Sequence, residues 1–126
     1  MSWIDSVPTF KAAATLAAKR FVKIDTSATD SAPAKVKYAG STGIPHGISQ
    51  YEAATNDLLA VKTLNYRVQE VEVTISTAIV VGTTIYPLDN GLGGDHQVTN
   101  ASAVAVALQQ AGASGDIIQV LMLGKF

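Results

Sequence analysis

The sequence contains no cysteine, and only 15% of its 126 residues are charged. Without cysteine the chain has no disulfide bond, no thiolate metal ligand and no cysteine nucleophile. The charged share is well below the roughly 25% of ordinary globular domains. The formal net charge is -1, so the overall charge gives no sign of a nucleic-acid-binding protein.

Long hydrophobic runs are also missing. The longest apolar run, AIVVG at 78–82, is far shorter than the roughly 20 residues of a membrane-spanning helix. The first residues, MSWIDSVPTF, carry an early acid and lack the basic start and apolar stretch of a secretory signal. We therefore expect a soluble protein that is not exported and has no contact with a membrane.

The few charges are unevenly divided along the chain. Residues 1–67 carry eight lysines and arginines against five acids, whereas from residue 68 onward a single lysine opposes five acids. Ordinary scatter of surface charge is the simpler explanation. The alternative is a charge dipole that orients subunits head to tail. The acids of the second part are Glu70, Glu72, Asp89, Asp95 and Asp116.

What the sequence does contain is a series of short alternating runs. Branched or aromatic residues alternate with polar ones at 20–27 (RFVKIDTS), 34–40 (AKVKYAG) and 67–76 (RVQEVEVTIS), and runs of similar style follow at 83–91 and 103–110. A period of two, interrupted by Gly, Asn, Asp and Ser, is typical of half-buried strands. Several short strands at close spacing predict an all-β fold, either a sandwich or a barrel.

The alanine-rich segment 9–20 (TFKAAATLAAKR) does not follow this pattern, because alanine favours helix. An internal repeat argues for strands instead. With an offset of 63, residues 15–24 fall on 78–87, so that Leu16 meets Ile79. The second copy is typical of a strand, a turn at Gly82 and a strand. We therefore favour strand, turn and strand in the first copy, with a helix as the alternative.

The repeat continues in two similar stretches, AATNDLLAVKTL at 53–64 and GASGDIIQVLML at 112–123. Together these matches define two units, at about 9–64 and about 74–123, with the same predicted order of strands. Two such units could close one small barrel that leaves few bare edges. We expect an N-terminal arm at 1–9 and one barrel-like domain at 10–126, built from two similar halves.

Each repeated stretch contains an Asp just before an aliphatic strand. Asn56-Asp57 and Gly115-Asp116 suit a tight reversal, because Asn and Gly tolerate positive φ and Asp bonds its own backbone. A catalytic carboxylate pair is the functional alternative. It needs both side chains in one pocket, and no base or nucleophile accompanies them. The turn interpretation is therefore preferred.

Two other motifs suggest ligands at first sight. The segment 89–96 (DNGLGGDH) has the composition of a calcium loop, but Gly91 and Gly93 stand where oxygen ligands are needed. We expect a flexible hairpin connection there. His46 and His96 are fifty residues apart, without a visible cluster of further ligands. We expect surface or turn histidines, no metal site, no cofactor, no catalytic residue and no enzyme activity.

The N-terminal arm is apolar and carries the only tryptophan, with Trp3, Ile4, Val7 and Phe10 close together. An apolar arm outside a compact barrel must bury its apolar side chains against some other surface. It either folds back on its own domain or docks on a neighbouring subunit or larger assembly, where aromatic anchors supply much of the binding energy.

The segments 12–25, 43–64, 71–91 and 101–123 resemble the small capsid cement, or head decoration, proteins of tailed bacteriophages. The shared pattern is a strand after a small turn, a Gly-Ile step, a small-residue loop ending in Gly-Asp and an aliphatic strand, given twice. Gly47-Ile48 and Gly115-Asp116 fit it. Asn56 replaces one expected Gly, and 105–107 (AVA) lacks another. The resemblance covers about 10–123.

This resemblance implies a β-barrel or tulip-like structural protein of the virion. Such a protein binds the outside of the assembled capsid, often as a homotrimer, and clamps neighbouring major capsid protein subunits against the pressure of the DNA. It is made in the host cytoplasm and does not contact nucleic acid directly. The candidate residues for binding the capsid or another subunit are Trp3, Ile4, Val7 and Phe10.

Two alternatives stay open. One is another β-rich part of the virion, such as a tail or fibre-base component. The other is a barrel that binds a small ligand or a carbohydrate. That barrel needs aromatic platforms, whereas the four tyrosines, three phenylalanines and one tryptophan are spread along the chain.

Overall fold

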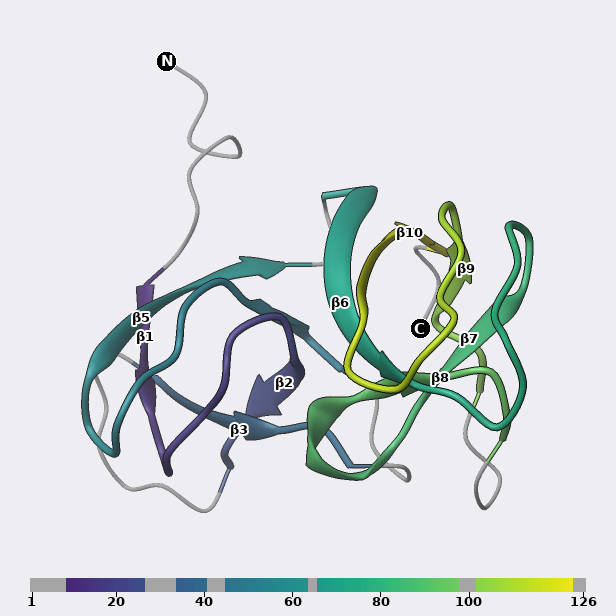
Figure 1. The fold of residues 1–126 in the computed structure, drawn as a ribbon. Helices are drawn as coiled ribbons and strands as arrows, with labels where there is room; N and C mark the ends of the chain where they lie inside the picture. The colour runs from purple at the N-terminus through teal and green to yellow at the C-terminus, as the bar shows by residue number, and fades with distance from the viewer. Residues whose placement is uncertain (1–8, 27–33, 41–44, 64–65, 98–101, 124–126) are drawn as a thin grey trace.

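A computed structural model describes residues 9–26, 34–40, 45–63, 66–97 and 102–123 (Figure 1). The strands of the first half are β1 (Thr9–Ala12), β2 (Phe21–Ile24), β3 (Lys35–Tyr38), β4 (Gly47–Ser49) and β5 (Leu58–Thr63). Those of the second half are β6 (Val68–Thr74), β7 (Thr84–Pro87), β8 (Gly93–Gly94), β9 (Ala105–Ala107) and β10 (Ile117–Met122), with a short 3₁₀ turn, η2 (Asp89–Gly91).

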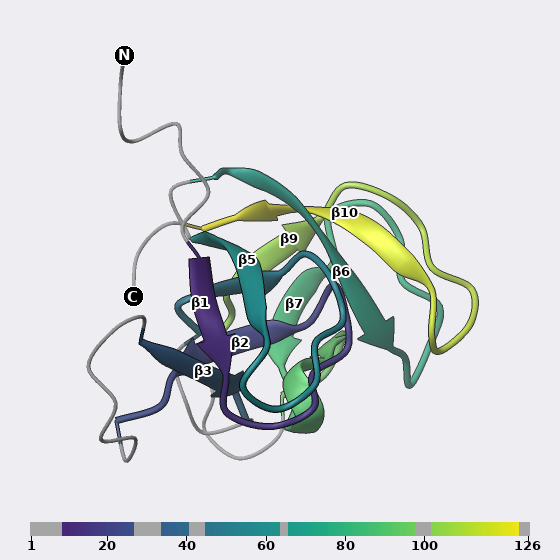
Figure 2. The same ribbon diagram turned by 90° about the vertical axis from the view of Figure 1, so that its left-hand side faces the viewer.

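The strands form two closed barrels that lie side by side (Figures 1 and 2). Barrel one has the strand order β1-β3-β2-β4-β5, and barrel two has the order β10-β6-β8-β7-β9. The predicted all-β fold of two similar halves is confirmed. The sequence allowed the halves to close one barrel together, but each half closes a barrel of its own.

The two barrels agree in topology and register. The first strand of each is parallel to the third and antiparallel to the fifth. The pair Phe21 and Ile48 in barrel one corresponds to Thr84 and Val106 in barrel two. Because β6 is the counterpart of β1, the second repeat of the structure starts at Val68, whereas the sequence placed it near 74.

The alanine-rich segment is extended, as the repeat predicted. Ala12 ends β1, and Leu16 forms an isolated antiparallel bridge with Ala53. Lys19 then turns the chain with φ 60°, where its counterpart Gly82 has φ 94°. Helix propensity is overruled because Ala12 and Leu16 are fully buried and the backbone pairs with distant segments. In the part of the chain that the structure describes, no helix is long and apolar enough to cross a membrane.

Apolar side chains fill both barrels, and the two cores meet. Barrel one encloses a cluster that includes Leu16, Val22 and Val61. The cluster of barrel two also takes in Phe21 and Ile48 from barrel one, both completely buried. The two barrels are therefore joined through a shared apolar contact.

The glycine-rich segment takes part in this contact. It does connect a hairpin, β7 to β8, but the expectation of a flexible connection is wrong because its glycines are buried and packed. A Cβ on Gly91 would lie 2.5 Å from the carbonyl oxygen of Phe21, and one on Gly93 would lie 3.3 Å from the Phe21 ring. Glycine here lets barrel two approach barrel one closely.

Candidate functional site

The predicted arm residues are only partly described. Phe10 lies on β1 opposite Leu59, is partly buried, and packs against the core cluster of barrel one. Trp3, Ile4 and Val7 lie outside the described residues. Their role in binding a capsid or a neighbouring subunit stays a prediction.

The two repeated Asp residues have the same role in both barrels. Asp57 Oδ2 accepts a hydrogen bond from the Ala54 N–H at 3.1 Å, and Asp116 Oδ2 accepts one from the Ala113 N–H at 3.2 Å. The residue before each Asp has positive φ, 70° at Asn56 and 98° at Gly115. Each carboxylate thus fixes its own turn, and Asn replaces Gly there because both tolerate this conformation.

Asp95 is a carboxylate with many hydrogen-bond donors around it, and its side chain is only 6% exposed. It accepts hydrogen bonds from the N–H and hydroxyl groups of both Ser76 and Thr77, and His96 Nδ1 lies 3.0 Å from Oδ1. Burial raises its pKa, but these hydrogen bonds outweigh burial and hold the pKa well below the usual range of Asp. Asp95 therefore ties β8 to the segment after β6.

The two histidines make contacts in different barrels. His46 Nδ1 accepts a hydrogen bond from the Ile24 N–H at 2.9 Å in barrel one, and His96 contacts Asp95 in barrel two. Among the described residues, no group of three or more His, Cys, Asp or Glu side chains could hold a metal ion. Each histidine therefore contacts a residue of its own barrel.

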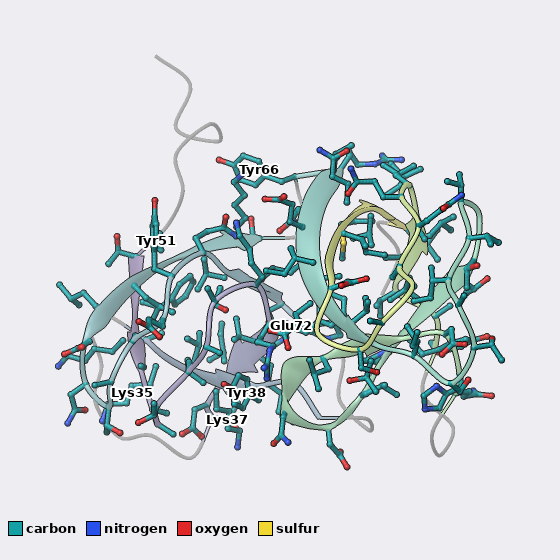
Figure 3. All side chains as sticks on the ribbon, in the orientation of Figure 1. Lys35, Lys37, Tyr38, Tyr51, Tyr66 and Glu72 are labelled. Atoms are coloured by element: carbon teal, nitrogen blue, oxygen red, sulfur yellow. The ribbon has the colours of Figure 1, made fainter. Side chains whose placement is uncertain are left out.

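Charged side chains hold the two barrels together around Glu72, which lies at their junction (Figure 3). The guanidinium group of Arg20 donates to both carboxylate oxygens of Glu72, at 3.3 and 3.2 Å, and to the carbonyl oxygen of Asn90 at 2.9 Å. It also lies 5.7 Å from the ring centre of Tyr38. Such a bidentate, partly buried pair fixes the relative placement of its elements.

The turn before Arg20 adds further contacts between the barrels. The Glu72 N–H donates to the carbonyl oxygen of Lys19 at 2.8 Å, and Lys19 Nζ lies 3.5 Å from Glu70 Oε1. Lys19 and Gln50 of barrel one line a polar hollow with Glu70 and Gln119 of barrel two. In barrel one, the turn 17–20 is therefore covered by barrel two.

The equivalent turn of barrel two has no such cover. Thr83 donates its N–H to the carbonyl oxygen of Val80 at 3.1 Å, which closes a tight turn. Val80 and Val81 are 58% and 61% exposed, and Leu108 on the adjoining segment is 37% exposed. We call Val80, Val81 and Leu108 the outer patch. Val80 and Val81 belong to the connection between β6 and β7, which lies at the end of the molecule away from barrel one (Figure 1).

Two hollows of the described structure lack the aromatic platform that a carbohydrate or small ligand would need. A hollow on barrel one is lined by Thr15, Leu16, Glu52, Ala53, Ala54 and Asp57, none of them aromatic. The hollow between the barrels is lined without an aromatic ring as well. Tyr51 is 69% exposed, and Tyr66 lies under Lys62 at 5.6 Å. Among the residues that the structure describes, aromatic side chains do not gather at either hollow.

The outer patch and the Arg20–Glu72 pair did not emerge from the sequence analysis. The repeat alignment contains a signal for the patch, because Val80 and Val81 fall on Ala17 and Ala18. Small residues suit a covered turn, and larger apolar residues on an exposed turn suggest a binding surface. Only the structure reveals which copy of the turn is covered.

Two closed five-stranded barrels with one topology, arranged in tandem, define the class of fold as a duplicated all-β double barrel. One solved structure with this fold is the crystal structure of the head fibre gp8.5 N base of bacteriophage phi29. The TM-score is 0.74 at 15% sequence identity, over 95% of this chain and 95% of that one. At this identity the similarity is one of fold. The sequence matches no protein-family model and no curated protein.

Proposed function

We propose that this chain is a structural component of a phage virion that attaches to the outer surface of the assembled capsid. One observation carries the proposal: the fold follows that of a phage head fibre base over 95% of both chains. The resemblance of residues 10–123 to head decoration proteins supports the same placement from the sequence. Both similarities point to the head of a phage, one from the fold and the other from the sequence.

The physical character of the barrels suits such a role. Closure pairs the strands around each barrel, which protects a protein concentrated on a lattice from edge-to-edge aggregation. A protein that binds only the assembled shell stabilises that shell by mass action. Weak contacts repeated over a lattice gain strength through multivalency.

In its specific form, the proposal is a cement protein. The chain contacts neighbouring major capsid protein subunits from the capsid exterior, as a homotrimer, after synthesis in the host cytoplasm. It makes no direct contact with nucleic acid or membrane. Clamping requires that one copy, or one oligomer, bridges at least two capsid subunits.

A second candidate is the base of a head fibre. The fold similarity to the phi29 protein favours it specifically, because that protein is described as a fibre base. A fibre base anchors a projecting element to the capsid and need not bridge capsid subunits. Both candidates bind the capsid, and they differ in what binding does to the shell.

The binding test mixes purified protein with expanded empty capsids and with unexpanded ones, and then pellets the capsids. Saturable binding to expanded capsids is expected, with little or none to the unexpanded form. Absence of binding to both would overturn the proposal. Heating the decorated capsids separates the candidates: a cement protein that bridges subunits strongly raises the temperature at which the shell breaks, whereas a fibre base gives only the smaller shift that follows from its binding.

A further inference from the structure

The outer patch of barrel two is the exposed counterpart of a surface that is already occupied in barrel one. The turn 17–20 corresponds to 80–83, and the backbone hydrogen bonds from each turn to the neighbouring strand agree. Lys19 donates its N–H to the carbonyl oxygen of Ser49 at 2.8 Å, as Gly82 does to that of Ala107 at 2.9 Å. In barrel one this surface binds the neighbouring barrel.

The surface that receives the turn 17–20 also has a counterpart. In barrel two it includes Glu70, Glu72 and Gln119, on the paired strands β6 and β10. From the register of the two barrels, the equivalent positions on β1 and β5 are Thr9, Lys11 and Ala60. Leu58 pairs with Lys11 across the two strands, so its side chain lies on the same face. We call these four residues the receiving face of barrel one.

Strand β1, which carries Thr9 and Lys11, and the β6–β7 connection, which carries Val80 and Val81, lie at opposite ends of the molecule (Figure 1). Leu58 is 63% exposed, so that both surfaces present large apolar side chains to solvent. Each end therefore carries one half of a contact that the chain already makes once, between its own barrels. The two halves cannot meet within one copy.

We propose that the outer patch of one copy docks on the receiving face of a second copy of this chain. The contact is heterologous, since two different surfaces meet, and it builds either a closed ring or an open chain. The homotrimer proposed above corresponds to a ring that closes after three copies. The docking itself concerns the free protein and does not depend on capsid binding.

The division of charge supports this orientation. Residues 1–67 have an excess of three positive charges and residues 68–126 an excess of four negative charges, from eight basic against five acidic residues and one against five. Head-to-tail contact places the acidic barrel of one copy against the basic barrel of the next, which favours this encounter over head-to-head contact.

The contact between copies must differ in chemistry from the contact within the chain. Within the chain it uses ion pairs of Lys19 and Arg20 and a backbone hydrogen bond from Glu72. Lys11, the counterpart of Glu72, already donates its N–H to the carbonyl oxygen of Ala34 at 2.9 Å. The contact between copies therefore relies on the apolar side chains Val81 and Leu58 and their neighbours.

Size-exclusion chromatography with light scattering on the whole protein, over a series of concentrations, tests the contact. We expect the mass to rise above that of a monomer with concentration. Val81→Lys and Leu58→Lys should each weaken association about tenfold or more, because each places a charge in an apolar contact. Ile117→Lys alters the counterpart of Leu58 in barrel two and should leave association unchanged. Circular dichroism checks that the variants are folded.

Mixing the two variants gives the sharpest result. The Val81→Lys chain keeps an intact receiving face, and the Leu58→Lys chain keeps an intact outer patch. A heterologous contact therefore predicts that an equal mixture forms dimers and nothing larger, although each variant alone stays monomeric. A monomeric wild type at every concentration, or a mixture that stays monomeric, would overturn the proposal.

Discussion

In barrel one the turn after Leu16 is covered by the other barrel, whereas in barrel two the equivalent turn after Ile79 faces solvent. Both turns place a residue of positive φ at equivalent positions, Lys19 and Gly82. They close differently: the Thr83 N–H donates to the carbonyl oxygen of Val80, whereas the Arg20 N–H donates to the Ser49 hydroxyl. The covered turn has alanines and is followed by Arg20 and Phe21, which bind barrel two. The comparison teaches that one copy of the duplicated turn is used for a contact within the chain, whereas the other copy leaves apolar side chains exposed.

Among equivalent positions of the two barrels, substitution should change the free energy of unfolding most unequally at Phe21 and Thr84. Phe21 is completely buried between the barrels, and its counterpart Thr84 is exposed. Phe21→Ala should lower the free energy of unfolding by roughly 3–5 kcal/mol, because it leaves a cavity in the shared core. Thr84→Ala should change it by less than about 0.5 kcal/mol. Urea unfolding measures both, and equal effects would contradict the role given to Phe21.

Substitutions at Gly91 and Gly82 distinguish the cost of backbone strain from the cost of disturbing close packing. Both have positive φ, 74° and 94°, but only a Cβ on Gly91 would meet other atoms. Gly82→Ala should destabilise by about 1 kcal/mol from strain alone. Gly91→Ala should destabilise by about 3 kcal/mol, because the barrels must also move apart. The same unfolding experiment compares them, and a smaller effect at Gly91 would argue against close contact of the barrels.

The Arg20–Glu72 pair tests how the barrels are fixed relative to each other. Its side chains are 16% and 25% exposed, so loss of one partner leaves a partly buried charge. Arg20→Ala should destabilise by about 2 kcal/mol. Thr83→Ala, at the equivalent position, removes only an exposed hydrogen bond from the Val80 N–H and should cost less than about 1 kcal/mol. A double-mutant cycle with Glu72→Gln measures the coupling, and a coupling energy near zero would show that the pair contributes nothing.

Asp95 makes a pH-dependent contribution to barrel two. Its folded pKa is lowered, so its stabilisation is present above the unfolded value of about 3.9 and is lost as the pH falls further. Asp95→Asn should destabilise by about 1.5 kcal/mol at neutral pH, and its difference from wild type should shrink below about pH 4.

Tyr38→Phe serves as the control for Asp95. At the equivalent position in barrel one, the Tyr38 hydroxyl accepts a hydrogen bond from the Ala17 N–H at 2.7 Å. The effect of Tyr38→Phe should not vary over the same pH range. Unfolding measured between pH 3 and 7 tests this. If the stability difference between Asp95→Asn and wild type did not change with pH, the pH-dependent stabilisation assigned to Asp95 would be contradicted.

The smallest effect on folding is expected from the N-terminal arm. Barrel one begins with β1 at Thr9, so removal of residues 1–8 should leave the unfolding midpoint within about 1 °C. Binding to expanded capsids should weaken if Trp3, Ile4 and Val7 anchor the protein, by about tenfold or more. Trp3→Ala in the full chain is the finer variant. Unchanged affinity in both would remove the arm from the binding site.

The sequence predicted features that depend on local chemistry. Period-two alternation gave the strands, and Asn56, Gly82 and Gly115 marked turns that require positive φ. The Asp57 and Asp116 turns followed from side-chain hydrogen bonding to the nearby backbone. These interactions lie within a few residues of each other, so a single sequence contains them.

Features that depend on long-range pairing were not predicted. Alternation does not specify partner strands, and so the closure of each repeat into its own barrel was missed. The packed glycines of 91–94 looked flexible because nothing local indicates that Phe21 lies against them. The exposure of Val81 depends on which copy of the turn meets a barrel, which only the assembled structure decides.

Cryo-electron microscopy of expanded capsids saturated with the protein tests the central claim most directly. The predicted result is double-barrel density on the outer capsid surface, with the outer patch of one copy against the β1–β5 face of the next. A bare outer surface under saturating conditions would contradict the assignment as a capsid-attached virion protein.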